Sequence, residues 1–213
     1  RLERPGDAIA ALQHLVRTLA PEDVGALEEL AGLCERVGDA PGLTDALWRQ
    51  LAVLEAPALR VPVARRLGEL HEADVPDEGR AIAALGAWAE ADPTDDEPLR
   101  RLVPKLEATR RHPRLTEVLD ALAGLELDDA AASDHVRRAA AIAHRQLGDV
   151  EGAWRRLAPR VRGGDEAAEA DLCALAESTG AGERLAELYV ALAQGSEDAE
   201  TQRRRWMDAA RVY

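Results

Sequence analysis

Histidines, cysteines and clustered carboxylates are the side chains in this sequence that could carry catalytic or metal chemistry. Zinc ligands on one helix need a spacing such as i, i+4, and a thiol nucleophile needs a neighbouring base. The histidines have no such spacing, and none pairs with a cysteine in a ligand pattern; they are His14, His71, His112, His135 and His144. Cys34 and Cys173 lie among apolar residues and are expected in the core. We therefore expect no metal, no cofactor and no enzymatic activity.

The clustered carboxylates favour a structural role. Asp95, Asp96 and Glu97 are consecutive, as are Asp128 and Asp129. Each cluster lies at or just before the start of an expected helix, where negative charge suits the positive end of the helix dipole. A general acid would need a carboxyl group in a dry pocket, which nothing in the sequence indicates. The basic run 203–205 is expected to be a solvated helix face.

Helices must position all of these side chains. Apolar residues recur at spacings of three and four along nearly the whole chain, interrupted by Gly, Pro and Asp. The pattern predicts about twelve helices, over residues 6–19, 22–37, 41–54, 58–73, 77–91, 96–111, 114–126, 131–147, 150–162, 166–179, 182–194 and 197–213. Gly38, Gly148 and Gly180 are expected to end helices in the left-handed conformation.

The composition agrees with an all-helical chain and excludes some partners. Hydrophobic residues make up 46% of the chain and aromatic residues only 3%, with no Phe, so Ala and Leu must fill the core. The net charge of −13 would repel nucleic-acid phosphates. No apolar stretch is long enough to span a membrane. We therefore expect neither nucleic-acid binding nor membrane insertion.

The turns within successive helix pairs recur at a regular spacing, which is typical of a helix-pair array. They fall near Gly38, Val75, His112, Gly148 and Gly180. The chain resembles the tetratricopeptide repeat family through matches to its first-helix and second-helix patterns. The matches include Leu67, Gly68 and His71, then Ala81, Leu85 and Pro93, and finally Trp206, Ala209, Ala210 and Tyr213. The half-a-tetratricopeptide and Sel1-like repeats are related alternatives.

This resemblance implies an all-α, right-handed superhelical α-solenoid of antiparallel helix pairs, as a single domain over residues 1–213. The first helix lacks a partner, and the last ends at Tyr213 before its turn, so we expect an interior segment of a longer array. Self-association through the uncapped ends is one expected interaction. No signal peptide is visible, and the expected compartment is the cytoplasm, although the chain begins at Arg1 without a Met.

The first helices of tetratricopeptide-like arrays line the concave groove, and here they carry two rows of charge. We aligned them on Leu30, Leu67, Leu102, Ala140 and Leu172. Two residues before these anchors lie Glu28, Arg65, Arg100, Arg138 and Ala170. Five residues after them lie Glu35, Glu72, Glu107, Arg145 and Glu177. The rows either grip acidic groups of a partner peptide or neutralise each other between neighbouring helices.

The predicted function is a scaffold that binds a partner protein or peptide in this groove. The predicted contact residues are Glu28, Glu35, Arg65, Glu72, Arg100, Glu107, Arg138 and Arg145. A regulatory sensor that binds a peptide or small ligand and changes the pitch of the superhelix is the alternative, and an enzyme on a helical frame is a third. The chain contains no Asn, so the carboxylate clamp of chaperone-binding relatives is not matched.

Overall fold

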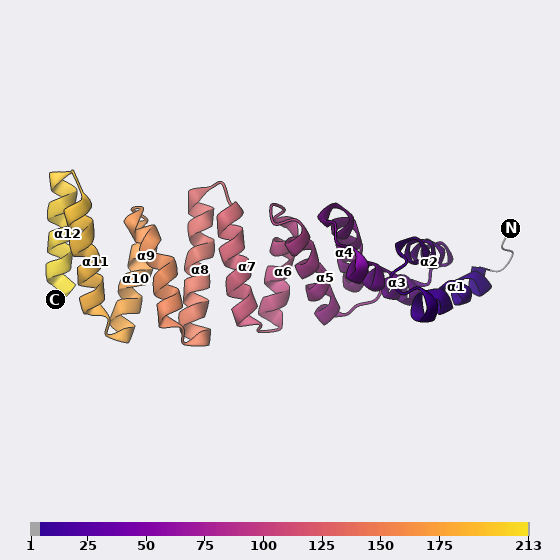
Figure 1. The fold of residues 1–213 in the computed structure, drawn as a ribbon. Coiled ribbons are helices and arrows are strands. Elements are labelled where there is room, and N and C mark those ends of the chain that lie inside the picture. The colour runs from indigo at the N-terminus through magenta and orange to yellow at the C-terminus, as the bar shows by residue number, and fades with distance from the viewer. Residues whose placement is uncertain (1–4, 213) are drawn as a thin grey trace. The chain divides into compact units, whose positions relative to one another are not determined.

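The computed structural model describes residues 5–212, and every regular element within them is a helix (Figure 1). The chain forms two compact units, Arg1–Ala108 and Thr109–Tyr213. The helices of the first unit are α1 (Pro5–His14), the π-helix η1 (Leu15–Leu19), α2 (Val24–Val37), α3 (Ala40–Val53), α4 (Pro57–Glu72), α5 (Glu78–Ala91) and α6 (Glu97–Ala108). None of the helices within residues 5–212 has the length and apolar character needed to cross a bilayer.

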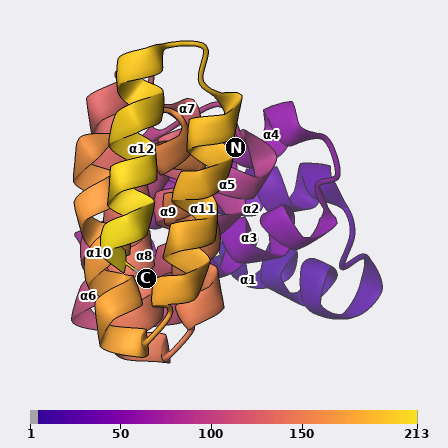
Figure 2. The ribbon, with the colours of Figure 1, turned by 90° about the vertical axis from the view of Figure 1, so that its left-hand side faces the viewer.

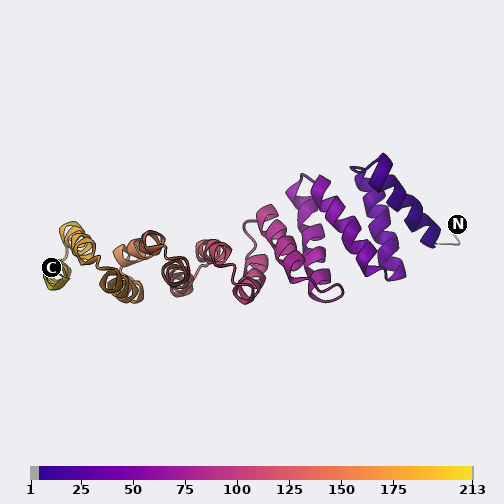
Figure 3. The ribbon, with the colours of Figure 1, turned by 90° about the horizontal axis from the view of Figure 1, so that it is seen from below.

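The second unit repeats the same construction. Its helices are α7 (His112–Leu125), α8 (Asp129–Leu147), α9 (Val150–Arg162), α10 (Glu166–Thr179), α11 (Gly182–Gly195) and α12 (Ala199–Val212). Within each unit, each helix packs against the one before it, and short turns make neighbours antiparallel (Figures 1 and 2). Seen end-on, successive helices of this unit alternate between two layers (Figure 3). The predicted all-α fold of consecutive antiparallel helices, about twelve in number, is confirmed in the described residues.

Aspartate side chains start many of the helices. Asp23, Asp39, Asp77, Asp149 and Asp165 each accept a hydrogen bond from the backbone N–H three residues later. These bonds satisfy amide groups that have no partner within the helix, and the carboxylates also suit the helix dipole. The Asp128 side chain accepts from the N–H of Ala130, as the capping role of that cluster predicts.

Glycine ends three helices as predicted. Gly38, Gly148 and Gly180 have φ angles of 75°, 66° and 69°, in the left-handed region that strains any residue with a Cβ atom. Gly38 and Gly148 each donate their backbone N–H to the last turn of the helix before them. The sharp turns that follow allow the next helix to fold back along its neighbour.

The core of each unit consists of Ala and Leu with a few large aromatic side chains. Trp88 is 1% exposed in the first unit. In the second unit, Trp154, Leu157, Leu172 and Tyr189 belong to one continuous cluster. Small residues bring the helices close together, because a Cβ atom on Gly68 of α4 would lie 3.4 Å from Leu85 Cδ2 of α5.

Three sequence-based expectations need correction. The expected α-helix over 6–19 becomes a π-helix from Leu15 onward. The expected pair of 96–111 with 114–126 is not a hairpin within one unit, because α6 packs on α5 in the first unit and α7 packs on α8 in the second. Arg205, expected on a solvated face, is 6% exposed. Tyr213, which completes the last repeat match, lies outside the described residues, and the single domain over 1–213 stays a prediction.

Candidate functional site

The predicted Arg and Glu rows meet in the first unit, but in a different register. Glu35 on α2 binds Arg66 on α4 at 3.0 Å, and Glu72 on α4 binds Arg101 on α6 at 2.5 Å. Each arginine comes one residue after its predicted counterpart. Successive residues on a helix differ by about 100° in direction, so a shift of one residue decides which side chain reaches the neighbour.

The predicted arginines of this unit lie beside the pairs and have partners of their own. Arg65 lies 3.5 Å from Glu69 and 3.8 Å from Glu97, and its guanidinium stacks over Trp88 at 5.3 Å. Arg100 binds Asp96 within α6 at 2.6 Å. Both side chains are about half exposed.

Three further predicted residues are exposed and also have partners. Glu28 on α2 accepts a hydrogen bond from Gln50 of α3 at 3.4 Å. Glu107 on α6 and Arg138 on α8 each interact with another group. To bind a partner protein, these three side chains would have to exchange the interactions that they already make within the chain.

The second unit contains charge pairs that sequence reasoning missed. Across its helices, Arg137 binds Asp171, Arg156 binds Asp120, and Arg184 binds Glu151, each at 2.6 Å, while Arg205 binds Glu169. In both units, such pairs join residues 29 to 36 positions apart in the sequence, which is about the length of one helix pair. Opposite charges recurring at that separation are the signal that could have revealed them. Most pairs are solvent-exposed, and each contributes about 0–1 kcal/mol of stability.

The pairs also shift carboxyl pKa values. Burial raises the pKa of Glu72, but hydrogen bonds from Lys105 and Arg101 outweigh burial and hold it below its ordinary 4.5. Burial likewise raises the pKa of Glu169, and hydrogen bonds from Arg205 and Tyr189 bring it below the same value. Carboxyl groups with a lowered pKa in the folded state stabilise the fold when they are ionised.

We therefore expect acid to weaken the fold in a defined pH range. A group with a lowered folded pKa contributes its full stability above its unfolded pKa and loses it as pH falls through the folded pKa. Urea denaturation followed by circular dichroism should show that the contribution of Glu72 and Glu169 to the free energy of unfolding declines as pH falls below about 4.5. Glu72→Gln should be less stable than the wild type at pH 7 and match it at pH 3. An unchanged difference between the two at both pH values would contradict the assignment to Glu72.

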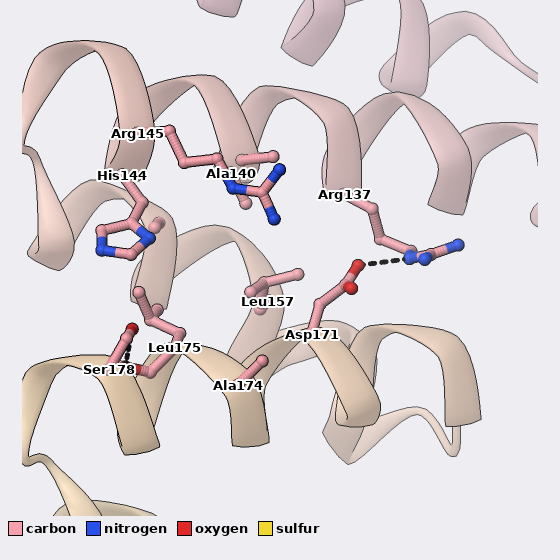
Figure 4. Close-up of a pocket in the computed structure, with 11 residues that line it drawn as sticks. Arg137, Ala140, His144, Arg145, Leu157, Asp171, Ala174, Leu175 and Ser178 are labelled. Atoms are coloured by element: carbon pink, nitrogen blue, oxygen red, sulfur yellow. Dashed lines mark hydrogen bonds and ion pairs between the residues drawn. The ribbon is translucent and has the colours of Figure 1, made fainter.

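A pocket of about 230 Å³ lies between α8 and α10, with residues of α9 at its floor (Figure 4). Its apolar lining is Ala140, Ala141, Ala153, Leu157, Ala174 and Leu175. Its polar lining is Arg137, His144, Arg145, Asp171 and Ser178. We call it the Arg145 pocket.

Arg145, a predicted contact residue, lines this pocket, and its guanidinium has no counter-charge among residues 5–212. Figure 4 shows its guanidinium turned toward the middle of the pocket near Leu157. It forms no ion pair or side-chain hydrogen bond with any residue in 5–212. In contrast, Arg137 and Asp171 bind each other, and the Ser178 hydroxyl donates to the Leu175 carbonyl at 3.0 Å.

His71 and the two cysteines lie in structural settings. The Trp48 indole donates to His71 Nε2 at 2.9 Å, and His71 Nδ1 lies 3.1 Å from the Val75 carbonyl oxygen. Cys34 is buried, which raises the pKa of its thiol. Cys173, expected in the core, is partly exposed and lies 3.2 Å from the Tyr189 hydroxyl. Within residues 5–212, no group of three or more His, Cys, Asp or Glu side chains is placed to hold a metal ion.

The fold is an array of consecutive antiparallel helices, and Gly68 and Leu85 meet where α4 and α5 pack closely. No family model matches the chain, and neither does any curated protein. Solved structures with a similar fold include MamA, with 13% identity, a TM-score of 0.37, and coverage of 79% of this chain and 89% of MamA. BtubC (BKLC) from P. vanneervenii has 14% identity, a TM-score of 0.35, and coverage of 98% of this chain and 87% of BtubC.

Proposed function

We propose that this chain is a non-catalytic scaffold that binds a partner protein or peptide through the first helices of its helix pairs, with the Arg145 pocket between α8 and α10 as a main contact. The Arg145 pocket supports this proposal because it combines an apolar floor with a guanidinium that has no partner among residues 5–212. The other predicted contact residues already bind or interact with neighbouring groups. Contact with Arg145 therefore requires no internal ion pair to break.

The pocket volume favours a protein side chain over a small-molecule ligand. Pockets that enclose drug-sized ligands measure roughly 300–1,000 Å³, whereas this one measures about 230 Å³. It is also open, and its rim is formed by two parallel helices of one layer, so a segment of a partner can cross it. The volume of the Arg145 pocket thus favours a protein side chain over a drug-sized ligand at this position.

A steric block of the pocket tests this function. Ala174 is exposed on α10 and lines the pocket, whereas Ala121 is exposed on α7 outside it. Peptides selected from a random displayed library on the full wild-type chain should bind Ala174→Trp at least about tenfold more weakly, a loss of about 1.4 kcal/mol. They should bind Ala121→Trp as they bind the wild type. Equal binding to both variants, or failure of the wild type to enrich any peptide, would refute the proposed site.

A further inference from the structure

We propose that the Arg145 pocket selects a glutamate side chain in an extended segment of the partner. This inference rests on the proposed function and adds the chemistry of recognition. It follows from the charge that remains after the ion pairs in and around the pocket have formed.

The second unit reverses the charges of the first at two equivalent positions. In the first unit, Glu72 lies five residues after its helix anchor, and it binds Arg101, one residue before the anchor of the next first helix. The same two positions hold Arg145 on α8 and Asp171 on α10. Arg145 and Asp171 would be the reversed equivalent of the Glu72–Arg101 pair.

Arg145 does not form that reversed pair, and another arginine holds Asp171 instead. Arg137 donates to Asp171 at 2.6 Å, and this hydrogen bond raises the pKa of Arg137 above its ordinary value. Asp171 is paired with Arg137, and Arg145 has no carboxylate partner among residues 5–212. The pocket therefore contains the unpaired guanidinium of Arg145 beside the ion pair of Arg137 and Asp171.

This arrangement suits a single negative charge on an apolar stem. One guanidinium fork can donate two parallel hydrogen bonds to one carboxylate. A phosphate dianion would bring a second charge close to Asp171, which already lines the pocket. The methylene groups of glutamate can cover Ala140, Leu157 and Ala174 while its carboxylate reaches Arg145. The net charge of −13 repels an acidic partner from the chain as a whole. The attraction for a glutamate therefore has to come from Arg145 in this pocket.

The test uses the full chain and amidated synthetic peptides taken from the library selection. Replacing the selected glutamate with glutamine should weaken binding to the wild type about tenfold or more, because a charge-assisted bond is lost. Arg145→Gln should bind the glutamate and glutamine peptides equally, and Arg145→Lys should recover only part of the preference. Arg155→Gln removes the same charge from an exposed site on α9 outside the pocket, and it should keep the full preference.

The outcomes separate this inference from the proposed function. If Ala174→Trp abolishes binding but glutamine replaces glutamate without loss, the pocket binds peptides and the glutamate assignment is wrong. Enrichment of phosphopeptides, or binding that needs a free C-terminal carboxylate, would also overturn it. If Ala174→Trp has no effect, the proposed function itself fails. A preference for glutamate that disappears in Arg145→Gln and survives in Arg155→Gln supports the inference.

Discussion

Trp88→Ala is expected to lower the free energy of unfolding of the first unit by about 3–5 kcal/mol. Trp88 is 1% exposed on α5, and the guanidinium groups of Arg65 and Arg101 lie 5.3 and 5.6 Å from its ring. Truncation removes the buried indole, leaves a cavity and removes both cation–π contacts. The chain has no Phe, and the surrounding core of Ala and Leu contains few large side chains able to fill that space.

Urea denaturation followed by circular dichroism at pH 7 measures the loss. Trp206→Ala is the matched control, because Trp206 is 44% exposed and its truncation should change stability by no more than about 0.5 kcal/mol. Repeat arrays can unfold in parts, so the transition of the first unit should move to lower urea while that of the second stays in place. A loss below 1 kcal/mol for Trp88→Ala would show that the indole is not a central packing element.

Arg205→Ala is expected to destabilise the second unit by about 3–5 kcal/mol. Arg205 is 6% exposed, binds Glu169 on the neighbouring helix of its layer, and lies over the Tyr189 ring at 5.4 Å. Its removal leaves a partly buried carboxylate without its hydrogen-bonded cation, and that loss accounts for most of the cost. Replacing both members of the pair with apolar residues, as in Arg205→Met with Glu169→Leu, should recover most of the loss.

The matched control is Arg184→Ala, since Arg184 also binds a glutamate and stacks on an aromatic ring. Its partner is Glu151 at 2.6 Å, and its ring contact is Trp154 at 4.3 Å, but both charged side chains are largely exposed. Its truncation should cost about 0–1 kcal/mol. The deficit of Arg205→Ala should also shrink as pH falls below about 4.5, because protonation neutralises the stranded Glu169. Equal losses for the two arginines would contradict the role of burial.

The local sequence accounts for most of the helices and their ends. Asp39 and Asp149 begin helices because their side chains accept from N–H groups three residues later. Gly38 and Gly148 end helices because each adopts positive φ. Such signals act over a few residues and need no tertiary contact. The π-turn at Leu15–Leu19 has no comparable local signal in the apolar pattern, and it was missed.

Helix pairing was less predictable than helix position. Every interior helix of a repeat array touches the helix before it and the helix after it, so turn spacing alone leaves the grouping open. The spacing near His112 suggested a hairpin of 96–111 with 114–126, whereas α7 packs on α8 in the second unit. Packing between side chains distant in sequence made that choice.

The sequence by itself determined the kind of fold, the charged layer and the presence of Arg145 within it. Only the tertiary structure decided which charges neutralise each other. Arg66 reaches Glu35 and Arg101 reaches Glu72, whereas the predicted Arg65 and Arg100 do not bind these two carboxylates. The reason is that successive residues differ in direction by about 100° around the helix. Arg137 holds Asp171 and Arg145 has no partner among residues 5–212, and which arginine reaches a carboxylate depends on positions in space that the linear pattern does not contain.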